Sequence, residues 1–424
     1  MIMGARMTAG ASADTPADTG SLRIMVCPHD LVMGGSQLSA IDLAATLKAR
    51  GHEVEVFAPP GPILPIVHER GLAYVAAPTP SGGFDARSAR ALAQEVRRFR
   101  PDIVHTFESW PTMASVRASR STPHRLVVTV MSMSIPDYLP DDVPLTVGTG
   151  ELAAGEEGRP GAVVLLEPPI DAEADAPGET AVARAALGLA DDAFVVAVVG
   201  RLSREHEKAA GVAHAIRALS AAELPVPMTL LVAGAGDDAD AVADAEAEAA
   251  ASANGREGRL AVRLLGNVDD PRRVYDAADV VFGMGGSALR AMSHAKPLIV
   301  QGKAGFWELL TPQSVNRFLV DGYFGDGPSG GPGVAELIAE LAVQPGRRVE
   351  LGAFGRRLVV ERYALTRAAE VLEQLYRYEL ATTRPLRARA RARRRSLARF
   401  AKFRVAIAAP WLQSTARTLT GRRG

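Results

Sequence analysis

The chain has 424 residues, 47% of them hydrophobic and 23% charged, and its formal net charge is zero. These values suit a globular protein with two domains of ordinary size. A single cysteine, Cys27, excludes a disulfide framework and a cysteine metal site, and no apolar run reaches the roughly 18–20 residues that a membrane span needs. We therefore expect a protein of the reducing cytoplasm.

The N-terminal segment, residues 1–20, lacks the apolar core of a signal peptide, and we expect a disordered leader there. After it, short apolar runs alternate with segments of helical periodicity, which indicates α/β structure with parallel strands. A first domain is expected over residues 21–170. Its expected strands are 22–27, 53–57, 73–76, 103–105, 126–130, 145–148 and 163–166, and its expected helices are 36–50, 63–70 and 88–99.

A glycine pair marks the first turn of this domain. Gly34 and Gly35 lie between the first strand and the first helix, where nucleotide-binding βαβ units place their phosphate turn. The pair does not form the GxGxxG fingerprint, so a nicotinamide-dependent dehydrogenase is not indicated.

Residues 171–365 repeat the same plan and are expected to form a second domain. An Ala-, Asp-, Glu-, Gly- and Pro-rich segment, which reaches about Gly178, is expected to link the two domains. Two Rossmann-like halves predict a ligand in the cleft at the carboxyl ends of both sheets. The expected strands are 194–199, 228–233, 260–265, 280–282 and 298–300, and the expected helices are 208–220, 238–251, 272–277, 288–295, 333–343 and about 348–378.

The most informative stretch is residues 279–301, which reads as strand, glycine loop, helix and strand. The loop contains Gly283, Gly285 and Gly286, and Ser287 is expected to cap the helix. Such a loop points bare backbone N–H groups and the positive end of a helix dipole at one spot, where a phosphate would bind. An ordinary tight turn with nothing bound explains this stretch alone equally well.

Several motifs stand in the order of a known family. The resemblance, from about Leu22 to Tyr378, is to the retaining GT-B glycosyltransferases of family 4, and it rests on the segments MGGSQLSAIDLAATLKARGHEVEVF, RPDIVHTFESWP, LLEPPIDAEADAP, VVGRLSREHEKAAGV and RLLGNVDDPRRVYDAADVVF. It implies two Rossmann-like domains that face each other across a cleft. It also implies an enzyme that transfers a sugar with retention from a UDP-, GDP- or TDP-sugar to a glycan, lipid-linked or natural-product acceptor, with no metal or other cofactor required.

The resemblance places the diphosphate of the donor at the segment VVGRLSREHEKAAGV. Arg201 follows a strand, and Lys208, one of only five lysines, stands at a helix start, where a cation is unfavourable for the helix dipole. Both placements suit a clamp on a leaving diphosphate, whose negative charge grows as the glycosidic bond breaks. Gly34 and Gly35 would let the backbone approach the donor.

Val268, in the turn that begins with Gly266 and Asn267, would lie beside the nucleotide base, although an ordinary turn is nearly as simple an interpretation. His105 and Glu108 are expected past the end of a strand, in the cleft. His105 is either a site residue or a structural core histidine. Glu108 is expected to orient a sugar hydroxyl or the acceptor.

The chain departs from the family at three positions. Phe107 replaces a histidine that contacts the donor sugar, and Phe282 and Arg290 replace two glutamates spaced eight residues apart. The second glutamate takes the ribose hydroxyls, and an arginine cannot accept those hydrogen bonds. Arg290 therefore indicates either a different nucleotide contact or a lost activity. The alternative hypothesis is a catalytically degenerate GT-B protein that acts as a binding or scaffolding partner. Glu308 is interpreted as a charge at a helix N-terminus.

Residues 366–424 are expected to form a C-terminal helix and a basic amphipathic tail. No acidic residue follows Thr382, while arginines recur and apolar residues are interleaved, among them Phe400, Phe403, Trp411 and Leu412. Such a tail is typical of a segment that lies on an anionic membrane surface. The alternative is a disordered arginine tail without a partner. No nucleic-acid partner is expected, and the protein would lie in the cytoplasm, peripheral on the inner face of the plasma membrane.

Overall fold

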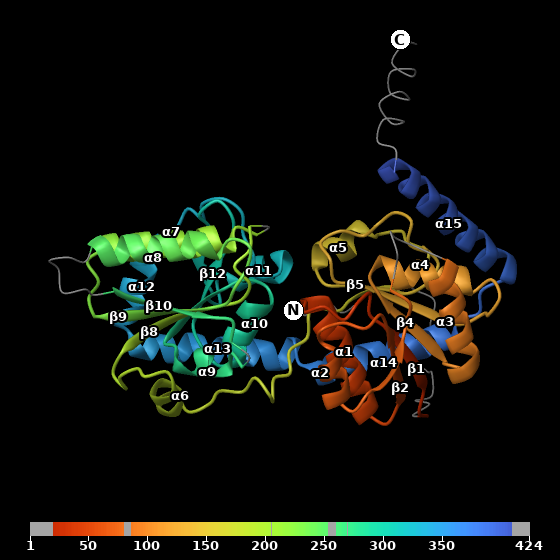
Figure 1. Cartoon of the computed structure of the whole chain (residues 1–424), viewed down its shortest axis with the longest axis horizontal. Coiled ribbons are helices and arrows are strands. Elements are labelled where there is room, and N and C mark those ends of the chain that lie inside the picture. Colours follow the sequence, from red (N-terminus) through yellow and green to blue (C-terminus); the bar gives the residue numbers. More distant parts are fainter. Residues whose placement is uncertain (1–19, 80–85, 205, 253–259, 269, 409–424) are drawn as a thin grey trace, which may run out of the picture. The chain divides into compact units, whose positions relative to one another are not determined.

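The computed structural model describes residues 20–79, 86–204, 206–252, 260–268 and 270–408. The chain divides into two compact units. The first takes in the chain up to Pro168 and again from Leu365 onward, and the second is Pro169–Ala364. In each unit a sheet is covered by helices on both faces (Figure 1).

The sheet of the first unit has seven parallel strands in the order β3-β2-β1-β4-β5-β6-β7. Its central strands β4 and β5 are buried along their whole length and mostly apolar, as expected of a parallel sheet covered on both faces. The strands are β1 (Arg23–Cys27), β2 (Glu53–Ala58), β3 (Ala73–Ala76), β4 (Ile103–Phe107), β5 (Leu126–Val130), β6 (Leu145–Val147) and β7 (Val163–Leu165).

Two helical layers cover this sheet. Ile24 and Val26 of β1 face a core built with α1, α2 and α14, whereas Met25 and Cys27 face a core built with α3, α4 and α15. Thus α14 and α15 complete the first unit although they follow the second along the chain. The helices are α1 (Gly35–Ala49), α2 (Leu64–Glu69), α3 (Ala86–Phe99), α4 (Ser109–Ala118), α5 (Gly150–Gly155), α14 (Leu365–Ala381) and α15 (Leu386–Ala408).

The sheet of the second unit has six strands in the order β10-β9-β8-β11-β12-β13, and only β13 is antiparallel to its neighbour. The strand order reverses at β8, between β9 and β11. In sheets of this kind ligands bind outside the carboxyl ends of the strands at such a reversal. The strands are β8 (Phe194–Val199), β9 (Met228–Ala233), β10 (Leu260–Gly266), β11 (Val280–Gly283), β12 (Leu298–Gln301) and β13 (Trp307–Leu309).

The helices of the second unit also form two layers. One face of the sheet packs against α7, α8 and α12, and the other against α9, α10, α11 and α13. The helices are α6 (Thr180–Ala186), α7 (Lys208–Ala221), α8 (Ala239–Ser252), α9 (Arg272–Ala277), α10 (Gly286–Ser293), α11 (Val315–Asp321), α12 (Val334–Ala342) and α13 (Pro345–Arg362).

The expected α/β class with two sheets is confirmed, and most expected elements lie within a few residues of the observed ones. The single helix expected over about 348–378 is wrong. The structure has two helices there, α13 and α14, which are separated by the non-helical residues Tyr363 and Ala364. Helices α4, α5, α6 and α11 and strand β13 were not expected.

Part of the sequence-based expectation for the two ends lies outside the described residues, namely the leader before Gly20 and the tail residues Trp411 and Leu412. Within the described ranges, none of the helices combines the length and the apolar character needed to cross a membrane.

Candidate functional site

The turn between β11 and α10 is built from glycines. Gly283 ends β11, and Gly285, with φ +51°, holds the position immediately before α10. No atom lies within 4 Å of a Cβ built on Gly285 or Gly286. The backbone at the start of this eight-residue helix can therefore be approached closely by a ligand.

Ser287 was expected to be the N-cap of this helix, and that is wrong because Gly285 holds the N-cap position. The Ser287 hydroxyl instead accepts a hydrogen bond from the Met284 N–H at 3.2 Å. It also accepts one from the Lys208 ammonium at 3.3 Å. Ser287 thereby connects the glycine loop to the start of α7.

Lys208 is the first residue of α7, and only 6% of it is exposed. Its Nζ donates to the Val199 carbonyl at 3.0 Å as well as to Ser287. Neither partner carries a negative charge, and burial lowers the pKa of Lys208 to about 8. A buried ammonium with neutral partners is costly, and an incoming anion would relieve that cost.

The space that Lys208 occupies exists because residue 200 is a glycine. Gly200 has φ +139°, and a Cβ at that position would collide with the Lys208 Nζ. Arg201 follows it, exposed, just past the carboxyl end of β8. Since β8 and β11 are parallel neighbours, the structure brings Arg201, Lys208 and the glycine loop to the same edge of the sheet. Val268 follows β10, two strands away from β8.

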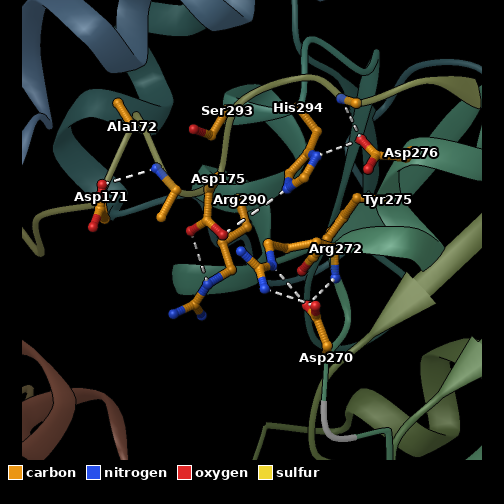
Figure 2. A network of polar contacts seen from close by, with 12 residues as sticks. Asp171, Ala172, Asp175, Asp270, Arg272, Tyr275, Asp276, Arg290, Ser293 and His294 are labelled. Atoms are coloured by element: carbon orange, nitrogen blue, oxygen red, sulfur yellow. Dashed lines mark hydrogen bonds and ion pairs between the residues drawn. The ribbon is translucent and has the colours of Figure 1, made fainter. Parts of the chain in front are cut away.

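A polar network lies one helical turn further along α10 (Figure 2). Arg290 Nε is 3.4 Å from Asp175 Oδ2. His294 is buried behind this pair, with Nδ1 hydrogen-bonded to Asp276 Oδ1 at 2.7 Å and Nε2 3.9 Å from Asp175 Oδ1. The imidazole is stacked on Tyr275 with 5.2 Å between ring centroids.

The segment expected to link the domains is hydrogen-bonded to the second unit. Arg356 of α13 donates to the Ala172 carbonyl at 2.6 Å and to the Ser293 carbonyl at 2.9 Å. The Gly178 N–H donates to Asp276 at 2.9 Å. Sequence reasoning placed this segment between the domains but missed its polar contacts, which join residues far apart in the chain.

In the first unit, Glu108 directly follows β4 and has φ +67°, a strained conformation for a non-glycine residue. Its carboxylate accepts hydrogen bonds from the backbone N–H of Met131 at 2.8 Å and of Ser132 at 3.1 Å. It also accepts one from the Ser36 hydroxyl at 3.3 Å. These contacts join the end of β4 to the residues after β5 and to the first turn of α1.

The glycine pair Gly34 and Gly35 lies beside this cluster, at the start of α1. A Cβ on Gly35 would meet nothing within 4 Å, so its backbone is accessible. Gln37 bridges two further residues of the same loop, since its amide nitrogen lies 3.0 Å from His29 Nε2 and 2.6 Å from Asp30 Oδ1. The sequence did not predict these contacts, because they depend on how the loop after β1 folds back onto the first turn of α1.

His105 was expected past the end of a strand, and that position is wrong. It lies inside β4, 1% exposed. Its Nδ1 is 2.7 Å from the Tyr376 hydroxyl and its Nε2 is 2.6 Å from Thr129 Oγ1. Burial lowers the pKa of His105 to about 3, so the ring is neutral and both nitrogens are used inside the core.

Two residues that the sequence analysis singled out, Phe282 and Glu308, are explained by their local contacts. Phe282 is fully buried in β11, and its ring lies 5.0 Å from that of Trp307. Glu308 was interpreted as a helix N-terminal charge, which is wrong, because it lies on strand β13 and accepts a hydrogen bond from Arg317 at 2.9 Å. Phe282 therefore supports the core, and Glu308 is neutralised by an arginine.

Comparison with known proteins gives two family matches. Residues 33–138 match "Glycosyltransferase Family 4" and residues 193–325 match "Glycosyl transferases group 1". The sequence has no match among the curated proteins.

Among solved structures, the chain is similar to a glycosyltransferase from Rickettsia africae, with 13% identity, a TM-score of 0.66, and coverage of 85% of this chain and 100% of that one. The chain is also similar to HepE from Anabaena in complex with UDP and glucose, with 15% identity, a TM-score of 0.62, and coverage of 84% of this chain and 100% of that one. A third similar structure is sucrose-phosphate synthase from Thermosynechococcus elongatus, with 17% identity, a TM-score of 0.62, and coverage of 85% of this chain and 100% of that one. At these identities the likeness concerns the fold.

Proposed function

Because the chain belongs to the glycosyltransferases of the family 4 and group 1 type, we propose that it transfers a sugar from a nucleoside-diphosphate sugar to an acceptor with retention. The observation that carries this proposal is the buried Lys208 ammonium beside the open glycine loop of α10. A positive charge with neutral partners, next to the open N-terminus of a helix, is suited to a diphosphate.

The chemical role proposed for this site is electrostatic. As the bond between the sugar and the diphosphate breaks, negative charge accumulates on the phosphate oxygens. Lys208, the N-terminus of α10 with Gly285, Gly286 and Ser287, and the exposed Arg201 would stabilise that charge. Because Lys208 is held by hydrogen bonds to Val199 and Ser287 before any ligand binds, little reorganisation is needed at the moment of reaction.

In this proposal the donor is a UDP-, GDP- or TDP-sugar. HepE, which shares this fold, was solved with UDP and glucose, and UDP is therefore the first nucleotide to test. No metal or other cofactor is assigned a role in this mechanism.

The first unit is proposed to hold the acceptor. Glu108 has a fixed carboxylate at the carboxyl ends of β1, β4 and β5, next to the accessible backbone of Gly35. A carboxylate fixed in this way could accept a hydrogen bond from an acceptor hydroxyl and orient it. The buried His105 is proposed to support this end of the sheet rather than to touch a substrate.

We also propose that α15 binds an anionic membrane surface near a lipid-linked or glycan acceptor. Arg387, Arg391, Arg394 and Lys402 are exposed, and their spacing puts them on one face of the helix. The exposed Val405 falls on the same face. A basic helix face with an apolar residue is suited to anionic lipid headgroups.

The test of the nucleotide site is calorimetric titration of the full-length protein with UDP, GDP and TDP. We expect micromolar binding of at least one nucleotide, and its loss in Lys208→Met, which keeps the volume of the side chain and removes its charge. Arg201→Ala is expected to weaken binding. Lys48→Ala, in the first unit, is the control and should bind as the parent protein does. No binding by the folded parent protein would overturn the proposed function and favour a scaffolding role.

A further inference from the structure

Three large apolar side chains are exposed at the carboxyl edge of the sheet in the first unit. Val32 and Met33, in the loop after β1, are 50% and 53% exposed, and Met133, in the loop after β5, is 67% exposed. Strands β1 and β5 both run parallel to β4 and flank it, so the two loops leave the sheet at the same edge. Single exposed apolar residues are common, but large ones gathered at one sheet edge indicate a binding surface.

The carboxylate of Glu108 joins these two loops. Its Oε1 accepts a hydrogen bond from the Ser36 hydroxyl at 3.3 Å and from the Ser132 N–H at 3.1 Å. Ser36 lies three residues after Met33, and Ser132 directly precedes Met133. The exposed apolar side chains therefore belong to the two segments that meet at the carboxylate proposed to orient the acceptor.

The backbone that presents Val32 and Met33 is held in place. The preceding residue, Leu31, is fully buried, and its carbonyl accepts a hydrogen bond from the Ile63 N–H at 3.0 Å. The Val32 N–H donates to Asp30 Oδ1 at 3.0 Å. A loop fixed in this way loses little conformational freedom when a ligand covers it, and methionine side chains can adapt to the shape of an apolar ligand.

Glu108 itself keeps the capacity to accept a further hydrogen bond. Its Oε1 is engaged by Ser36, Ser132 and the Met131 N–H. From the described residues, its Oε2 accepts one hydrogen bond, from the Ser132 hydroxyl at 2.8 Å. A carboxylate oxygen can accept two, and Glu108 is only half-buried. A hydroxyl acceptor and an exposed apolar surface thus occur together.

We propose that the acceptor is amphipathic, with a hydroxyl oriented by Glu108 and a hydrocarbon chain that lies on Val32, Met33 and Met133. This inference rests on the proposed function, since it assumes that the first unit holds the acceptor, and it selects a lipid-type acceptor over a free glycan. A free glycan presents mainly hydroxyls, which these apolar side chains cannot hydrogen-bond. Helix α15, whose basic face is suited to a lipid surface, belongs to the same unit.

The test compares two probes that share a head group, octyl β-D-glucoside below its critical micelle concentration and methyl β-D-glucoside, by calorimetry on the full-length protein. We expect the parent protein to bind the octyl probe about tenfold or more tightly than the methyl probe, because each methylene group removed from water strengthens binding by about fourfold. In Val32→Thr/Met33→Gln/Met133→Gln, which keeps the sizes of the side chains and makes them polar, this preference should fall to about one.

Val349→Thr/Val360→Thr is the matched control, because both valines are exposed on α13 of the second unit. It should keep the preference of the parent protein. Equal binding of the two probes by the parent protein would overturn the inference, as would a preference that survives in the triple variant. If the triple variant kept the preference but lost binding to phosphatidylglycerol vesicles, the surface would be a membrane contact and the inference would also be overturned.

Titration of the same samples with UDP, GDP and TDP separates this inference from the proposed function. The triple variant should bind nucleotide as the parent protein does, because the Lys208 site lies in the other unit. Failure of every nucleotide to bind the parent protein would overturn the proposed function, whatever the two glucosides show.

Discussion

The Lys208 ammonium lies 3.3 Å from the Ser287 hydroxyl and joins the first residue of α7 to the first turn of α10. Both helix N-termini thereby meet at the carboxyl edge of β8 and β11. A buried cation placed between two helix N-termini is unfavourable in the free protein, because the helix dipoles repel it. Its electrostatic benefit is realised only when an anion arrives.

Nucleotide affinity is therefore expected to depend on pH. Burial lowers the pKa of Lys208 to about 8, so the ammonium is charged below this pH and neutral above it. The affinity for the nucleoside diphosphate should be constant below pH 8 and should fall by up to about tenfold per pH unit above it. Calorimetry at pH 7, 8 and 9 measures this change. The Lys208→Met variant should bind weakly at every pH, and an affinity in the parent protein that stays flat up to pH 9.5 would contradict the assignment.

Gly200→Ala tests the space around the same lysine. A Cβ at residue 200 would collide with the Lys208 Nζ, and φ +139° is strained for alanine. We expect the free energy of unfolding to fall by about 1–3 kcal/mol and nucleotide binding to weaken. Gly346→Ala, at an open position in α13, is the control and should be neutral or slightly stabilising. Chemical denaturation with calorimetry measures both effects, and unchanged binding in Gly200→Ala would count against Lys208 as the diphosphate ligand.

His105 is expected to contribute stability that is lost in acid. Burial lowers its pKa from 6.5 to about 3, so the unfolded chain binds the proton more tightly between these values. The contribution is complete above pH 6.5 and should be lost as the pH falls, by about 1.4 kcal/mol per unit. Denaturation of the parent protein and His105→Gln at pH 7, 6 and 5 should show their difference in stability shrinking. Nucleotide affinity of the folded variant should be unchanged, whereas a loss of affinity would indicate a site role.

The basic face of α15 is expected to bind anionic lipid. Reversing three charges in Arg387→Glu/Arg391→Glu/Arg394→Glu should weaken binding to phosphatidylglycerol-rich vesicles by about a hundredfold or more, since each cation near such a surface contributes about 1 kcal/mol. Vesicle sedimentation at two salt concentrations measures this effect. Phosphatidylcholine vesicles should not be bound, and Arg217→Glu, on α7, should behave as the parent protein does. Equal sedimentation of the triple variant would remove α15 as the contact.

The sequence predicted the elements whose signals are local. Apolar runs identified most strands, and the first helix, expected over 36–50, ends at Ala49, two residues before Gly51, which has φ +96°. The break between α13 and α14 could not be predicted, because it is stabilised by a distant contact, in which the Ile170 N–H donates to the Tyr363 carbonyl at 2.7 Å. Helix α4 was also missed. It begins directly after Glu108, whose positive φ cannot be recognised from the residue type.

The candidate site divides in the same way. Lys208 and the glycine loop were found because their motif is contiguous in the sequence. Asp175 was missed because it lies in a segment with the composition of a linker, and only its 3.4 Å contact with Arg290, over a hundred residues later, marks it. Ser287 was given the wrong position in its helix because a cap residue and a residue of the first helical turn look alike in sequence.

The place of α14 in the first unit has a consequence for biosynthesis. Leu372 and Tyr376 of this helix pack into the same core as Ile24 and Ile41, and Tyr376 carries the hydroxyl that meets His105. A ribosome delivers Ile24 and His105 early but makes Tyr376 only after the whole second unit. The unit whose synthesis starts first is therefore the last to be completed, and until then its nascent core presents apolar surface that chaperones can bind.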